Sequence, residues 1–146
     1  MADLSRFKEI PLPLMPKGRM PTEHEEQRAF VAIFRKCFDA RIFAIPNGGK
    51  RGKAEAGRLK SEGVSPGVPD LFIPEWLLWI EFKRQKGGRV DEAQKDWHDY
   101  LLSIGHFVKI CKGAEDARRQ VVEFAANELV NKNRRESRIE EMEKGK

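Results

Sequence analysis

Three charged residues interrupt the most apolar stretch of the sequence, and their types could support metal-dependent chemistry. Asp70 stands at the start of this stretch, and Glu81 and Lys83 lie near its end. Two carboxylates beside an apolar surface repel each other and lose hydration, and a bound divalent cation removes both penalties. Carboxylate oxygens suit Mg²⁺, which also takes water and phosphate oxygens as ligands. A lysine beside such an ion could orient a hydrolytic water or stabilise a pentacovalent phosphate, so the pattern indicates metal-assisted phosphodiester hydrolysis.

A β-hairpin would bring the three residues together if its turn has the right length. We expect two strands, 70–73 and 76–83, joined by a two-residue turn at Pro74-Glu75. This pairing sets Asp70 opposite Trp79 and makes Asp70 and Glu81 diagonal neighbours on one face, about 7–8 Å apart between backbones. A turn one residue longer would move Asp70 to the other face. In the alternative interpretation, Asp70 is a turn residue and Glu81 and Lys83 are a solvent-facing pair.

The first helix offers a third carboxylate. Thr22 begins a capping box that starts a helix running to about residue 38. Glu26 lies on the apolar stripe of this helix, four residues before Phe30 and seven before Ile33. Glu23 lies one turn earlier on nearly the same side. The alternative for both is an acid favoured by the positive end of the helix dipole.

Gln94 lies near the start of a later helix, beside its predicted core side. Asp91 caps this helix, and Asp91-x-x-Gln94 also has the form of a capping box, which gives Gln94 an alternative, purely structural role. The pattern predicts that the core side of the helix consists of Ala93, Trp97, Tyr100, Leu101 and Ile104.

The remaining elements complete an α/β sandwich around a small mixed sheet. We expect a strand at 41–45, a short helix within 50–63, a strand at 106–111 and a last helix from 114 to about 130. Residues 1–21 hold four prolines and are expected to form an extended arm. The domain then spans 22–130, and 131–146 is a charged tail forming a frayed or solvated helical extension.

Composition favours an acidic partner. The net charge is +5 and the pI is about 9.3, a balance typical of nucleic-acid binding, although an ordinary basic protein is the alternative. The densest basic segment is a candidate for phosphate contacts and contains Lys50, Arg51, Lys53, Arg58 and Lys60. No segment approaches the roughly 18 apolar residues of a membrane helix, and no P-loop indicates a nucleotide cofactor. Two isolated cysteines fit a reducing, cytoplasmic location.

The ordered set of motifs resembles a known family. Gly67-Val68-Pro69-Asp70, then Glu81-Phe82-Lys83, then Gln94 are similar to the motifs of the PD-(D/E)XK nucleases, and more narrowly to the VRR-NUC (virus-type replication and repair nuclease) family. The segments 45–72 and 87–111 resemble the sequences that flank these motifs in small phage and bacterial members. The similarity covers about residues 22–122 and implies the αβββαβ core of restriction-type endonucleases.

The resemblance also implies roles for these residues. Asp70 and Glu81 would be metal ligands, with the Phe82 backbone carbonyl as a third, and Lys83 would be the catalytic lysine. The family uses a glutamate of the first helix, for which we favour Glu26, acting on the metal through water, over Glu23 and Glu25. Gln94 would support the site. Mg²⁺ would be the cofactor, with Mn²⁺ able to substitute.

Compact family members imply a DNA substrate and an assembly state for this chain. We expect a homodimer acting on branched DNA such as Holliday junctions, in the cytoplasm of a bacterial or phage-infected cell. The proline-rich arm and Arg134 and Arg135 could add contacts, although a solvated charge run is the preferred interpretation of the two arginines. One alternative is a nuclease that acts on flap, duplex or single-stranded DNA. The other is a module that binds branched DNA without cutting it.

Overall fold

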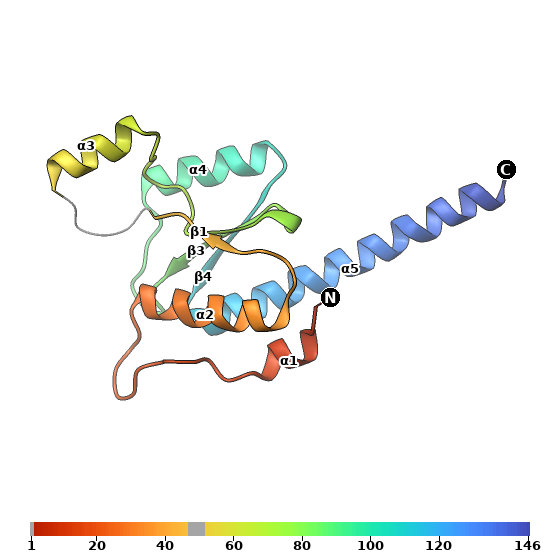
Figure 1. The fold of residues 1–146 in the computed structure, drawn as a ribbon, viewed down its shortest axis with the longest axis horizontal. Helices are drawn as coiled ribbons and strands as arrows, with labels where there is room; N and C mark the ends of the chain where they lie inside the picture. Colours follow the sequence, from red (N-terminus) through yellow and green to blue (C-terminus); the bar gives the residue numbers. More distant parts are fainter. Residues whose placement is uncertain (1, 47–51) are drawn as a thin grey trace.

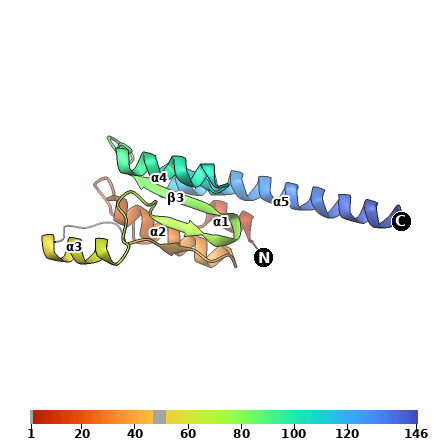
Figure 2. The ribbon, with the colours of Figure 1, turned by 90° about the horizontal axis from the view of Figure 1, so that it is seen from above.

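The computed structural model describes residues 2–46 and 52–146, which form a four-stranded sheet with helices on both faces (Figures 1 and 2). The helices are α1 (Leu4–Glu9), α2 (Glu23–Cys37), α3 (Lys53–Ser61), α4 (Glu92–Ser103) and α5 (Ala114–Lys144). The strands are β1 (Phe43–Ala44), β2 (Leu71–Ile73), β3 (Leu78–Lys83) and β4 (Phe107–Lys112). Within these ranges no helix is long and apolar enough to cross a membrane.

The sheet has the order β1-β2-β3-β4 and is mixed. The pairs β1–β2 and β2–β3 are antiparallel, whereas β3 and β4 are parallel and are joined through α4. Elements α2 to β4 therefore follow the order αβββαβ, interrupted by α3. This confirms the predicted α/β class and the restriction-endonuclease-like core.

The predicted hairpin turn is wrong, yet the face on which Asp70 lies is as predicted. A short 3₁₀ helix (Pro74–Trp76) and Leu77, in the left-handed conformation with φ of 50°, connect the strands, so Ile73 pairs with Leu78 rather than Trp76. The connection is thus two residues longer than expected. Because side chains alternate with a period of two, this shift keeps Asp70 on the predicted face and moves it directly opposite Glu81.

One face of the sheet carries the apolar core. Ile80 and Phe82 of β3 are fully buried on this face, and Phe82 contacts Phe30 of α2 with ring centroids 5.8 Å apart. Figure 2 shows α2 and α1 on one side of the strands and α4 on the other. The α4 side is the face of Asp70, Glu81 and Lys83. The apolar core therefore fixes β3 from one side and leaves its other side for polar groups.

The sequence predicted an extended amino-terminal segment, but part of this segment is helical. Residues 4–9 form α1, which Asp3 caps by accepting the Arg6 N–H. Phe7 is fully buried and packs edge-on against Phe38 with centroids 4.9 Å apart. Burying one aromatic side chain contributes about 2–3 kcal/mol, enough to fix a short helix against the body of the protein.

The charged tail continues the last helix. Helix α5 is unbroken from Ala114 to Lys144, and its second half extends away from the sheet (Figure 1). Its first half joins the core through Val121 and Phe124. The predicted helical extension is confirmed.

Candidate active site

Asp70 is held at the edge of β2 by backbone contacts on two sides. Its carbonyl accepts the Ile45 N–H at 2.8 Å, and its Oδ2 accepts the Phe82 N–H at 2.7 Å. The loop before it approaches α4 closely at Gly67, where φ is 92° and an added Cβ would meet the Ala93 carbonyl. A glycine is required here for both the backbone conformation and the close contact.

Glu81 is the most unusual carboxylate of this face because it is buried with one oxygen unpaired. Its Oε1 accepts a hydrogen bond from Gln94 Nε2 at 2.7 Å, and its Oε2 has no hydrogen-bond partner. Burial, followed by the charge of Asp70, raises the pKa of Glu81 to about 8. A buried, unpaired carboxylate oxygen is costly unless a proton or cation occupies the space beside it.

Lys83 lies beside Glu81 and is oriented by the same amide. Its Nζ donates to Gln94 Oε1 at 2.7 Å and lies 3.7 Å from Glu81 Oε1, and the side chain is buried. Gln94 Oε1 also accepts the Asp91 N–H at 3.0 Å, which completes the capping box of α4. Gln94 therefore fills both roles that the sequence left open: it caps α4 and it holds the two charged groups.

Burial disfavours the ionised forms of both Asp70 and Glu81. Burial is the main cause that raises the pKa of Asp70, the Phe82 N–H opposes it, and the charge of Glu23 adds to it. Both shifts favour the protonated forms, and a bound divalent cation would favour the ionised forms instead.

The donor set fits a hard divalent cation that keeps most of its water. Among the described residues, no three His, Cys, Asp or Glu side chains lie close enough to form a metal-ligand group. Mg²⁺ commonly binds through one or two carboxylates together with waters and substrate oxygens, which this pair can supply. The predicted third ligand, the Phe82 carbonyl, belongs to β3 and stays a prediction.

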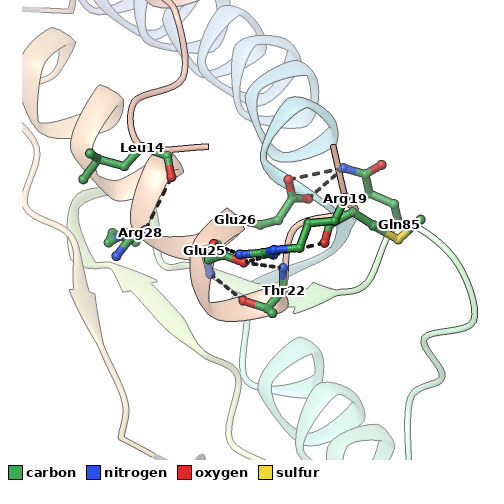
Figure 3. A network of polar contacts seen from close by, with 8 residues as sticks. Leu14, Arg19, Thr22, Glu25, Glu26, Arg28 and Gln85 are labelled. Atoms are coloured by element: carbon green, nitrogen blue, oxygen red, sulfur yellow. Dashed lines mark hydrogen bonds and ion pairs between the residues drawn. The ribbon is translucent and has the colours of Figure 1, made fainter. Parts of the chain in front are cut away.

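The glutamates of α2, the first helix predicted from the sequence, differ in their contacts (Figure 3). Glu25 completes the capping box with Thr22 and pairs with Arg19 at 2.7 Å, which contributes to lowering its pKa to about 2. Glu26 is buried, accepts the Ala114 N–H at 3.1 Å and receives Gln85 Nε2 at 3.3 Å. These contacts give Glu26 a structural role at the start of α5, and its predicted action on a metal stays a prediction.

Glu23 is the first-helix carboxylate whose charge acts on the site. It raises the pKa of both Asp70 and Glu81. The sequence favoured Glu26 because that residue lies on the apolar stripe, but the apolar stripe faces the core and not the charged side of β3. Position on the helix dipole, which fits both residues, could not separate them.

Helix α4 faces the sheet with a different side from the one predicted. Gln94 is half-buried and His98 and Leu101 are buried, whereas Tyr100 and Ile104 are 53% and 51% exposed. Of the five residues predicted for the core side, Leu101 is buried and Trp97 half-buried, whereas Ala93, Tyr100 and Ile104 are exposed. The prediction is therefore wrong in part, because the surface that α4 covers is the charged site, which selects polar groups. His98 is a residue of this face that the sequence missed, and its Nε2 is buried without a partner.

Part of the predicted DNA-binding segment forms α3. Lys53, Arg58 and Lys60 belong to this helix, which has no buried residue, and Arg58 pairs with Glu62 at 3.3 Å. Lys50 and Arg51 lie outside the described residues. Figure 1 shows α3 standing apart from the sheet at the end where α4 begins.

Comparison with solved structures gives a match to a protein named as a nuclease domain. A solved structure described as a "VRR_NUC domain protein" superposes with a TM-score of 0.60 at 25% sequence identity, over 73% of this chain and 89% of that one. No family model matches the sequence, and no curated protein matches it. The structural match supports the resemblance that the motifs indicated.

Proposed function

We propose that this chain, whose fold and structural neighbour support assignment to the VRR-NUC family, is a divalent-metal-dependent DNA endonuclease of the PD-(D/E)XK type. The observation that carries the proposal is the unpaired, buried Oε2 of Glu81 beside Asp70 and Lys83. Such an arrangement is unfavourable by itself and becomes favourable when a cation is bound, so it is difficult to explain as packing alone.

Asp70 and Glu81 would hold the cation, and Mg²⁺ is the candidate, with Mn²⁺ able to replace it. Bound there, a divalent ion supplies Lewis acidity and favours ionisation of a water molecule. The protein fixes its carboxylates beforehand: Phe82 N–H holds Asp70 and the Gln94 amide holds Glu81. This preorganisation avoids rearrangement when substrate binds.

Lys83 would act on the phosphate. Its ammonium group is buried and held by Gln94, next to the carboxylates, where it can orient water or stabilise negative charge that develops on a phosphodiester. A buried ammonium group interacts strongly with nearby charge, so Lys83 can stabilise a phosphate beside it although its side chain is buried. The glutamate contribution from the first helix is best assigned to Glu23, acting through its charge or through water.

The DNA would be held by contacts to its phosphates. Lys53, Arg58 and Lys60 on exposed α3, together with Lys50 and Arg51, are candidates for sequence-independent contacts that weaken as salt rises. Arg134 and Arg135 of α5, together with the amino-terminal segment, could add to them. The cytoplasm of a bacterial or phage-infected cell is the compartment that this substrate implies.

Branched DNA and a homodimer are the preferred substrate and assembly. A two-fold dimer would present two sites to a four-way junction. The protruding half of α5 supports association because it exposes apolar side chains, with Ile139 55% and Met142 69% exposed. Light scattering of the purified chain would measure the assembly directly.

The test is a cleavage assay on labelled junction, flap, fork, duplex and single-stranded DNA, with and without Mg²⁺. Asp70→Ala should abolish cleavage while the fold and most of the DNA affinity remain. Cleavage at the wild-type rate by folded Asp70→Ala would refute the site. Junction binding with no product under any divalent metal would instead support the alternative, a non-cleaving branched-DNA-binding module.

A further inference from the structure

A pocket lies next to the catalytic face and is not used by the chemistry described above. It has a volume of about 560 Å³ and is lined by Ile45, Pro46, Glu62, Gly63, Val64, Ser65, Val68 and Trp97. This volume lies within the range of small-ligand pockets, about 300–1,000 Å³. The lining residues come from segments that also position the site.

The walls of the pocket are continuous with the candidate active site. Ile45 follows β1 and donates its N–H to the Asp70 carbonyl at 2.8 Å, and in the β1–β2 register it lies directly opposite Asp70. Its side chain therefore shares the face of Asp70. Val68 comes two residues before Asp70, and Trp97 follows Gln94 by one turn of α4. A molecule in this pocket would lie beside a phosphate bound at the site.

The chemistry of the described lining is unfavourable for a phosphate and fits a nucleobase. Of the described residues that line the pocket, Glu62 alone carries a charge, which is negative and paired with Arg58 at 3.3 Å. Within residues 2–46 and 52–146, the lining therefore offers no cation to an anionic phosphate. The remaining surface is mostly aliphatic, with one indole ring at Trp97 that is only half-buried. Flat aromatic bases stack on such rings irrespective of sequence.

A single polar handle completes the lining. Trp97 Nε1–H donates to Ser65 Oγ at 3.3 Å, which orients the indole. The Ser65 hydroxyl keeps its own hydrogen, which can be donated to a ring nitrogen or carbonyl of a base. One hydrogen bond and a stacking surface would hold any base without selecting strongly among the four.

We propose that this pocket receives one unpaired nucleobase of the bound DNA, adjacent to the phosphate that is cut. The inference rests on the proposed nuclease function and narrows its substrate. A base in a Watson–Crick pair is stacked and hydrogen-bonded inside the duplex and cannot enter without being extruded, at a cost of a few kcal/mol. DNA with an unpaired nucleotide beside the cut therefore binds more tightly than continuous duplex.

The test combines a protein change with a DNA change. The 146-residue wild-type chain and its Trp97→Ala variant are titrated in EDTA with labelled forked DNA in which an abasic residue replaces one nucleotide at a time near the branch. At one position the abasic residue should lower wild-type affinity about five- to tenfold, as expected for one lost stacking contact. Trp97→Ala should show the same loss with intact DNA and no further loss with that abasic DNA.

Two more variants cover a failure of Trp97→Ala to fold. Trp97→Phe keeps a stacking ring and should retain wild-type affinity, whereas Val64→Trp fills the pocket and should lose it. Phe107→Ala is the matched control, because Phe107 is a 44% exposed aromatic residue on the opposite face of the sheet. Its affinity for DNA should equal that of wild type.

Additive losses from the abasic residue and from Trp97→Ala would overturn the pocket assignment. So would a change of oligomeric state in Trp97→Ala, since the pocket would then be a contact between copies. If the protein cuts DNA but the losses from the abasic residue and from Trp97→Ala are independent, the pocket proposal is contradicted and the nuclease proposal is not. If the two losses are coupled but the protein cuts no DNA, the nuclease proposal is contradicted and the pocket proposal is supported.

Discussion

Asp70 and Glu81 lie opposite each other across β2 and β3, and the charge of Asp70 adds to burial in raising the pKa of Glu81 to about 8. Glu81 is buried and Asp70 is half-buried on the α4 face, where desolvation opposes ionisation of both. A proton and a divalent cation therefore compete for this pair of carboxyls. This competition leads to a prediction about stability that needs no substrate.

The metal-free protein should lose stability as the pH rises from about 4.5 towards 8. Glu81 has a pKa of about 8 in the folded protein against 4.5 for the free side chain, so the folded state binds the proton more tightly over this interval. The stabilisation is complete below pH 4.5 and is lost as Glu81 ionises, on the order of 2–4 kcal/mol. Urea unfolding in EDTA at pH 5 and pH 8.5 measures it.

Glu81→Gln is the control for this pH effect. The amide does not titrate, so the stability of the variant should change much less over the same interval, and Mg²⁺ should stabilise wild type at pH 8.5 but not the variant. Parallel pH profiles for the two proteins would show that the carboxyl pair does not hold the proton.

Gln94→Ala should reduce cleavage about 10- to 100-fold. The amide holds Glu81 at 2.7 Å and Lys83 at 2.7 Å, and loss of such supporting contacts around a metal site has effects of this size. Asp91→Ala is the matched control, since it removes the α4 cap at a cost of about 1 kcal/mol but leaves the Gln94 side chain its contacts with the site. Equal losses of activity in the two variants would mean that Gln94 matters only as a cap.

Gly67→Ala should lower both stability and activity. At Gly67 a Cβ would meet the Ala93 carbonyl and come within 2.8 Å of Gln94 N, and φ is 92°, so strain and overpacking together should cost about 2–5 kcal/mol. Gly105→Ala has a comparable φ of 91° with no atom within 4 Å of the added Cβ, and should cost about 1–2 kcal/mol with activity kept. Thermal unfolding and cleavage rates of the two variants separate the cost of backbone strain, which both share, from the cost of the contact with α4, which only Gly67→Ala makes. Equal losses in the two variants would exclude an effect of that contact.

The sequence predicted the faces of the hairpin better than its turn. Alternation of Glu81, Lys83 and their apolar neighbours depends only on strand periodicity, which is local. The length of the connection depends on how Pro74 and Leu77 pack, and Leu77 adopts a left-handed conformation that few non-glycine residues favour. Asp70 kept its face because the error was an even number of residues.

Tertiary context explains the other differences. Phe7 gave no periodic signal among prolines, yet one buried ring fixes α1. In α4, the spacing of apolar residues predicted that Tyr100 and Ile104 face the core. The helix instead covers a charged surface, and Gln94 and His98 face it. The residue pattern of a helix cannot show whether the helix packs on an active site or on an apolar core, because that depends on the side chains of the strand that it faces.

Glu23 and Glu26 should respond differently to substitution. Glu23 is exposed and its charge acts on Asp70 and Glu81, so Glu23→Gln should leave stability nearly unchanged and raise the Mg²⁺ concentration for half-maximal cleavage about tenfold. Glu26→Ala removes the buried acceptor of the Ala114 N–H and should cost about 2–3 kcal/mol, with the Mg²⁺ requirement unchanged. Mg²⁺ titrations of cleavage, paired with urea unfolding, separate the two effects. The reverse pattern, a raised Mg²⁺ requirement for Glu26→Ala alone, would restore the sequence-based choice of Glu26 as the carboxylate that serves the metal.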